Sequence, residues 1–193
     1  MSVLPVVTYD DSVLRKPAEP VVPEHPDLQQ LIDDMFDTMY EANGVGLAAP
    51  QVGVSLTLFV VDADAITDEE EEESFGPGVF INPEIETIDE EKWDAEEGCL
   101  SLPEIREKVT RPEAIRIRYL DREFQSHEEV HRGWYARVLQ HEYDHLRGVL
   151  FIDYLGALRK RLIRKKLEEI RLGSVNAEYC LLPKSSQGSD QGR

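Results

Sequence analysis

The chain of 193 residues carries 39 acidic and 21 basic residues, so its formal net charge is −18 at pH 7. This charge disfavours general binding to nucleic acid, whose phosphates carry the same sign. Hydrophobic residues make up 41% of the chain, enough for a folded core, and two cysteines cannot form a disulfide framework. Apolar runs are too short to cross a membrane, and the first residues do not resemble a leader peptide. We therefore expect a cytoplasmic globular protein with no membrane partner and no specific nucleic-acid partner.

The first half of the chain predicts a helix, a turn, a strand and a loop. Apolar residues at helical spacing predict a helix over residues 26–42, which Asn43 and Gly44 would end. Small residues at 44–53 predict a turn that needs glycine at positive φ, and an apolar strand follows at 55–62. Six consecutive acidic residues, 68–73, indicate a solvated loop.

The second half predicts strands and then two helices. Three short runs are typical of strands and predict antiparallel sheet: 79–88, 105–109 and 113–121. Helical spacing returns at 133–147, where Gly148 marks the end, and a third helix is expected at 156–172. The polar residues 184–193 indicate a flexible tail. The sequence thus predicts an α+β fold with one domain over 1–183, in which antiparallel sheets pack around the helix at 133–147.

The strongest chemical signal is His141-Glu142-Tyr143-Asp144-His145 (HExxH). Residues four apart on a helix share one face and lie about 6 Å apart along its axis, so His141 and His145 can reach one metal ion. Glu142 beside them is placed to act as a base for a water at that metal. The pattern predicts a metal-dependent hydrolase.

A second match to the same pattern, from His127 to His131, lies in a stretch without helical periodicity. If that stretch is a strand, the two residues are about 13 Å apart and cannot share one ion. We therefore expect His127 and His131 to be exposed residues on a polar strand or turn.

The residues alone leave the third metal ligand open. A longer metalloprotease motif would place a histidine where this chain has Phe151. Glu168 or Glu169 would serve in an HExxH zinc metallopeptidase, the alternative function, although both lie in a charged helical run. A zinc module without activity would instead need a fourth protein ligand. The remaining candidate is Cys99, although a lone cysteine is more often an ordinary buried thiol.

Three segments together resemble the signature motifs of the peptide deformylases, in the same order: 44–51 (GVGLAAPQ), 97–101 (EGCLS) and 140–148 (QHEYDHLRG). The resemblance implies a hydrolase that removes the formyl group from N-formylmethionyl peptides, the starts of newly made polypeptides, and releases formate. It also implies that Cys99, His141 and His145 hold the metal and that Glu142 is the acid-base residue.

The resemblance further implies how the substrate binds. The side-chain amide of Gln51 and the backbone N–H of Leu100 would hold the formyl oxygen. Glu97 and Arg111 match a structural ion pair behind the cysteine. Other residues would contact the peptide backbone or the methionine side chain of the substrate. The peptide backbone would pair with Gly44, Val45 and Gly46 as an added strand, and the methionine side chain would rest on Val45, Arg106, Trp134 and Val138.

The metal and one further partner complete the expectations. A set of two histidines and one cysteine suits zinc and other late transition ions, whereas the resemblance implies Fe²⁺ in the cell, with Ni²⁺ or Co²⁺ as working substitutes and Zn²⁺ in preparations. Seven of the 21 basic residues lie within residues 159–171. In so acidic a chain, this basic helix suggests weak, salt-sensitive docking to the ribosome.

Overall fold

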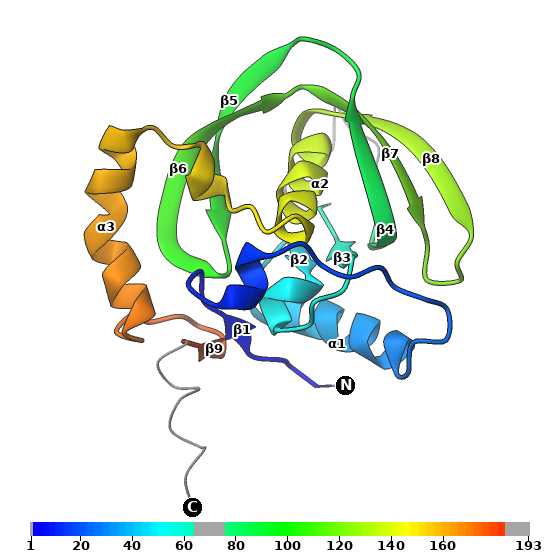
Figure 1. The fold of residues 1–193 in the computed structure, drawn as a ribbon, viewed down its shortest axis with the longest axis horizontal. Coiled ribbons are helices and arrows are strands. Elements are labelled where there is room, and N and C mark those ends of the chain that lie inside the picture. The colour runs from blue at the N-terminus through cyan, green and yellow to red at the C-terminus, as the bar shows by residue number, and fades with distance from the viewer. Residues whose placement is uncertain (1, 64–75, 184–193) are drawn as a thin grey trace, which may run out of the picture.

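The computed structural model describes residues 2–63 and 76–183, and Figure 1 shows the fold. The acidic run 68–73 and the polar tail 184–193, for which a loop and a flexible end are expected, lie outside the described residues. The fold class is α+β with mainly antiparallel sheets, as the sequence predicts. Within the described ranges, no helix is both long enough and apolar enough to span a membrane.

The largest layer is a five-stranded antiparallel sheet with the strand order β2-β3-β4-β7-β8. Its strands are β2 (Gly46–Ala48), β3 (Leu58–Val61), β4 (Gly78–Thr87), β7 (Ala114–Leu120) and β8 (Ser126–Arg132). β2 lies at one edge of the sheet, beside β3. The strands predicted at 79–88 and 113–121 are confirmed as β4 and β7, and the strand predicted at 55–62 is confirmed over its second half.

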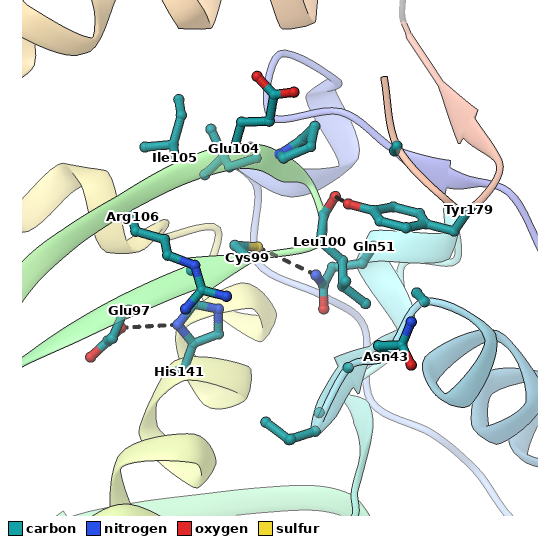
Figure 2. A pocket seen from close by; sticks show the side chains of 18 of the residues that line it. Asn43, Gln51, Glu97, Cys99, Leu100, Glu104, Ile105, Arg106, His141 and Tyr179 are labelled. Atoms are coloured by element: carbon teal, nitrogen blue, oxygen red, sulfur yellow. Dashed lines mark hydrogen bonds and ion pairs between the residues drawn. The ribbon is translucent and has the colours of Figure 1, made fainter. Parts of the chain in front are cut away.

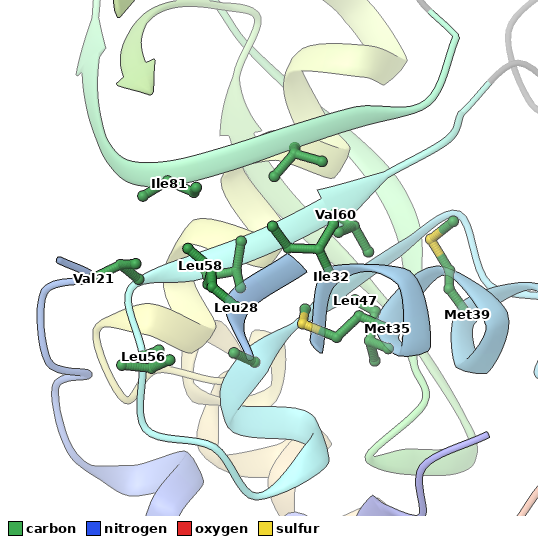
Figure 3. Close-up of a cluster of buried hydrophobic side chains, with 12 residues drawn as sticks. Val21, Leu28, Ile32, Met35, Met39, Leu47, Leu56, Leu58, Val60 and Ile81 are labelled. Atoms are coloured by element: carbon green, nitrogen blue, oxygen red, sulfur yellow. The ribbon is translucent and has the colours of Figure 1, made fainter. Parts of the chain in front are cut away.

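Two helices cover opposite faces of this sheet. α1 (Leu28–Glu41) packs on one face, where it buries Met35 against the β3 residues Leu58 and Val60 in the cluster shown in Figure 3. α2 (Gly133–Leu146) packs on the other face, against the alternate β3 residue Phe59. Side chains alternate between the two faces of a strand, so β3 is apolar throughout because both of its faces are buried.

The strands β5 (Lys92–Cys99) and β6 (Leu102–Pro112) form a separate hairpin. The sequence does not predict β5, because its residues KWDAEEGC are mostly polar. β6 extends beyond the predicted 105–109 at both ends, and its pairing with β5 supplies the backbone hydrogen bonds that hold both as strands. In Figure 1, α2 lies between this hairpin and the five-stranded sheet, so its buried residues face the interior of the molecule.

The chain ends meet on one side of the molecule. α3 (Ala157–Arg171) packs against β6 and buries Ile163 and Ile170. β1 (Val6–Val7) then pairs in parallel with β9 (Leu181–Leu182). The connecting segments also contain three short 3₁₀-helices, at Ser12–Arg15, Ala49–Val52 and Phe151–Tyr154.

The turn predicted at 44–53 is more structured than expected, because it contains β2 and a 3₁₀-helix. Positive φ occurs at Asn43 (φ 52°) and Gly53 (φ 81°). The expectation that glycine supplies positive φ therefore holds for Gly53 and is wrong for Gly44 and Gly46. Gly46 instead meets a requirement for space, since a Cβ atom there would lie 2.6 Å from Oε1 of Glu142.

Candidate active site

A cleft of about 870 Å³ opens between the five-stranded sheet and the β5–β6 hairpin. Its walls come from the segment that leads into β2, from the turn between β5 and β6, from α2, and from residues 176–179 after α3. Figure 2 shows side chains of this cleft. Of the residues that the sequence predicts for the site, nearly all line the cleft: Gly44, Val45, Gly46, Gln51, Cys99, Leu100, Arg106, Trp134, Val138, His141 and Glu142.

The three predicted metal ligands converge at the base of this cleft. Cys99 ends β5, whereas His141 and His145 lie one turn apart on α2. One sulfur or nitrogen atom from each of the three lies within 4.8 Å of the other two, and Sγ of Cys99 is 3.3 Å from Nε2 of His145. A thiolate and two imidazoles at this spacing fit a transition-metal ion such as iron, cobalt, nickel or zinc.

A buried ionic network holds His141 from behind. Oε2 of Glu97 is 3.0 Å from Nδ1 of His141, which turns the other ring nitrogen toward the cleft (Figure 2). Arg111 donates two hydrogen bonds to Glu97, at 2.6 and 2.9 Å, and a third to Asp144 at 2.8 Å. Arg137 donates to Glu97 as well, at 2.6 Å. The Glu97–Arg111 ion pair expected from the sequence is therefore present, within a larger network.

The charges of this network determine how Glu97 ionises. Burial by itself would raise the pKa of Glu97, but hydrogen bonds from His141 and Arg111 hold that pKa well below its usual range. His145 behaves differently, because burial and the neighbouring His141 lower its pKa well below the usual value. His145 is therefore neutral near pH 7, which is the form in which an imidazole binds a metal.

Glu142 is buried beside the metal-ligand group. Burial raises its pKa to about 7, even though His141 and Arg111 act in the opposite direction. Its Oε2 has no hydrogen-bond partner within the described structure, while its side chain packs closely over Gly46. A carboxylate with a near-neutral pKa at the edge of a metal site is suited to exchange protons with a water molecule.

Gln51 is oriented by its own local turn. Its Oε1 accepts a hydrogen bond of 2.8 Å from the backbone N–H of Ala48, and this bond identifies the oxygen and nitrogen of the amide. The amide nitrogen then points toward Sγ of Cys99, at 3.5 Å (Figure 2). The side chain of Gln51 thus presents a donor to the cleft.

The predicted substrate-contacting residues lie around the mouth of the cleft. Val138 is buried, whereas Trp134 is 38% exposed and packs edge-on against Trp93. The side chain of Arg106 is 74% exposed and lies 4.0 Å from Glu96, so it forms part of the rim. These positions are compatible with an apolar pocket that is bordered by charge.

The second HExxH match does not join the site. β8 carries both histidines, so the prediction of a strand is confirmed. The expected exposure is wrong for His131, which is 6% exposed, packs edge-on against Tyr135 and lies 2.9 Å from Glu129. His127 is half-buried against Tyr119 and lies 2.7 Å from Asp121. Packing on this face of the sheet explains both histidines.

The alternative third ligands also lie elsewhere. Glu168 is held by Arg171 on the exposed side of α3, at 2.5 Å, and Glu169 lies 3.5 Å from Lys165. Phe151 is buried and stacks on the ring of His141. Neither glutamate is in the cleft lining, so the geometry disfavours the metallopeptidase alternative.

Sequence reasoning did not identify three residues that surround the site. Arg137 lies four residues before His141, on the same buried face of α2. This helical spacing could have indicated that Arg137 is close to the site. Asp144, inside the HExxH segment, binds Arg111. Tyr179 reaches the cleft from the far end of the chain, and its hydroxyl donates to the carbonyl of Leu100 at 2.7 Å. No local pattern in the sequence indicates this contact.

One thiol, two imidazoles on one helix face and a buried carboxylate of near-neutral pKa define the class of a metal-dependent hydrolase. Comparison with known proteins identifies the family within this class. The family model for polypeptide deformylase matches residues 3–161. The peptide deformylase of Salinibacter ruber is 51% identical over 189 residues, covering 96% of this chain and 97% of the relative. The peptide deformylase of Christiangramia forsetii is 46% identical, and the match covers 92% of this chain and 94% of the relative.

Solved structures agree with the sequence comparison. A peptide deformylase from Legionella pneumophila is 42% identical and superimposes with a TM-score of 0.78, covering 91% of this chain and 99% of its own. The peptide deformylase from Ehrlichia chaffeensis, solved with actinonin, is 38% identical and has a TM-score of 0.79. The match covers 91% of this chain and 100% of that one. The chain therefore belongs to the peptide deformylase family.

Proposed function

We propose that this chain removes the formyl group from N-formylmethionyl peptides, releasing formate and a peptide with a free amino terminus. The observation that carries the proposal is the convergence of Cys99, His141 and His145 with Glu142 at the base of the cleft. Family membership supports the same reaction.

The three ligands would hold one divalent ion, which we propose is Fe²⁺ in the cell. The sulfur and the two nitrogens suit Zn²⁺, Ni²⁺ and Co²⁺ as well, so the choice among them rests on the family resemblance. When bound, the ion supplies a Lewis acid that polarises the formyl carbonyl and lowers the pKa of a water molecule. His141, Cys99 and His145 would hold the ion, and three protein ligands are one fewer than the four that close a structural zinc site.

Glu142 moves the proton in this mechanism. It accepts a proton from the attacking water and then transfers that proton to the nitrogen of the leaving amine. Its raised pKa of about 7 in the absence of an ion suits both directions of transfer near neutral pH. Gly46 permits this position, because no side chain at residue 46 displaces the carboxylate.

Gln51 and Leu100 stabilise the negative charge that develops on the formyl oxygen. The Gln51 amide is held ready by the N–H of Ala48, so it needs no reorganisation during the reaction. The backbone N–H of Leu100 belongs to the residue that follows Cys99, at the turn between β5 and β6. Removing one such donor costs about 3 kcal/mol of barrier in comparable sites.

The edge of the five-stranded sheet binds the peptide. β2 is an edge strand, and the segment 44–46, which leads into it, lines the cleft. A substrate in extended conformation would add to this edge through backbone hydrogen bonds, which are independent of its side chains. The methionine side chain would lie against Val45, Trp134 and Val138, with Arg106 on the rim.

Formate release tests the reaction directly. Iron-loaded protein is incubated with a formyl-methionyl tripeptide, with the acetylated tripeptide as a matched control, and with casein. We expect formate from the first substrate only. Digestion of casein without formate release would favour the metallopeptidase, and inactivity toward all three would favour a structural metal module.

We also propose that the protein acts in the cytoplasm and docks weakly to ribosomes through α3. Several of its cations are engaged within the molecule: Arg159 binds Glu107, Lys160 binds the carbonyl of Asp153, and Lys166 binds that of Glu104. Arg161 and Arg164 are exposed on the same helix. The neighbouring Leu158 and Leu162 are 71% and 62% exposed, which adds apolar surface to the charge.

Sedimentation with ribosomes over a salt series tests this docking. Replacing Arg161, Arg164 and Lys165 with Gln should weaken sedimentation at low salt and leave peptide hydrolysis unchanged. In a control variant, Lys16, Lys92 and Lys108 are replaced by Gln, so its net charge equals that of the α3 variant. This control should sediment like the wild type. Equal behaviour of the two triple variants would refute a role for α3.

A further inference from the structure

The turn that carries Leu100 belongs to an irregular hairpin. Cys99 pairs with Leu102 and Gly98 pairs with Arg106, so the Leu100–Ser101 loop is followed by an irregularity in β6 rather than by a regular ladder. Two-residue hairpin loops favour turns with positive φ, because these match the twist of the strands. Neither Leu100 nor Ser101 has positive φ. The positive φ in this region instead occurs at Glu104 (φ 62°), and contacts from distant segments add to the support of the turn.

Two hydrogen bonds from distant segments hold the carbonyl groups of the turn. The hydroxyl of Tyr179 donates to the carbonyl of Leu100 at 2.7 Å (Figure 2). The backbone N–H of Tyr9 donates to the carbonyl of Ser101 at 3.0 Å. One donor comes from near the start of the chain and the other from near its end.

The segment 174–182, here called the C-terminal strap, is fixed on both sides of Tyr179. Val175 packs into the cluster that contains Ile163 and Ile170 of α3. Leu181 and Leu182 pair with β1, and the N–H of Val6 donates to the carbonyl of Cys180 at 2.8 Å. Between these anchors, residues 176–179 line the cleft.

We propose that the C-terminal strap is part of the active site and that Tyr179 is a positioning residue for Leu100. By holding the Leu100 carbonyl, Tyr179 restricts rotation about the backbone bonds of Leu100 and so limits the directions open to the N–H of Leu100. The inference rests on the proposed function, in which that N–H binds the formyl oxygen. Tyr179 lies beyond residues 3–161, which the family model matches.

The variant Tyr179→Phe removes the hydroxyl and keeps the ring. Loss of one such hydrogen bond corresponds to a decrease in kcat of about three- to tenfold. KM for a short formyl-methionyl peptide and the metal content should not change, because the contact affects the orientation of a donor to the transition state. Backbone amide exchange in residues 99–102 should become faster.

Tyr40→Phe is the matched control. Tyr40 lies on the surface, and its hydroxyl donates to Asp62 at 2.7 Å. It should behave like the wild type in kcat, KM and exchange at 99–102. Equal kcat for the Tyr179 and Tyr40 variants, with an active wild type, would overturn this inference alone. Absence of formate release by the wild type would overturn the proposed function as well.

Discussion

Glu142→Gln separates the chemistry of this site from its stability. The substitution keeps the size of the side chain, which Gly46 accommodates, and removes the ability to accept a proton. Turnover should fall by about 100-fold or more, the usual contribution of a general base. Metal content should not change, because the metal ligands Cys99, His141 and His145 are intact.

The same substitution should stabilise the metal-free protein. The pKa of Glu142 rises from 4.5 to about 7 on folding, so between these values the folded state binds more protons than the unfolded state. The contribution of Glu142 to the free energy of unfolding therefore decreases as pH rises through this window. One unit of pKa shift corresponds to about 1.4 kcal/mol. Burial of the Glu142 carboxylate therefore lowers the free energy of unfolding by about 3 kcal/mol at about pH 8 and by less than half of that near pH 5.5. The uncharged amide of the Glu142→Gln variant carries no such cost.

Urea unfolding of metal-free protein measures this difference. Glu142→Gln should be more stable than the wild type at the higher pH, and the advantage should shrink at the lower pH. Glu90→Gln, at an exposed position, is the control and should match the wild type at both. If the Glu142→Gln variant is no more stable than the wild type, or if its advantage does not depend on pH, burial is refuted as the cause of the raised pKa.

Two further predictions concern the metal group and the space beside it. Cys99→Ala and His145→Ala should abolish metal binding in elemental analysis, whereas His131→Ala should retain the metal because His131 contacts Glu129 on β8. Loss of metal from the His131 variant would contradict the assignment of the site. Gly46→Ala should displace Glu142, since the added Cβ would lie 2.6 Å from its Oε1. We expect kcat/KM to fall by about 10- to 100-fold with the metal retained, and normal turnover would show that the carboxylate can shift without cost.

Local patterns in the sequence were sufficient to predict several elements of the fold. Apolar spacing predicted α1 and α2 within a few residues, because each helix buries one continuous stripe. The four-residue interval between His141 and His145 already placed both imidazoles on one helix face. The resemblance of three motifs then assigned Cys99 to the same site, which periodicity alone left undecided.

Features that depend on contacts between distant segments could not be predicted from the sequence. β5 is too polar to predict, and it exists as a strand through its pairing with β6. Gly46 shows no local need for glycine, because the atom that excludes a side chain belongs to Glu142, on a helix far along the chain. The link between Tyr179 and Leu100 joins residues 79 positions apart. Sequence patterns report local conformation and burial, whereas contacts of this kind arise only after the sheets, helices and chain ends have packed together.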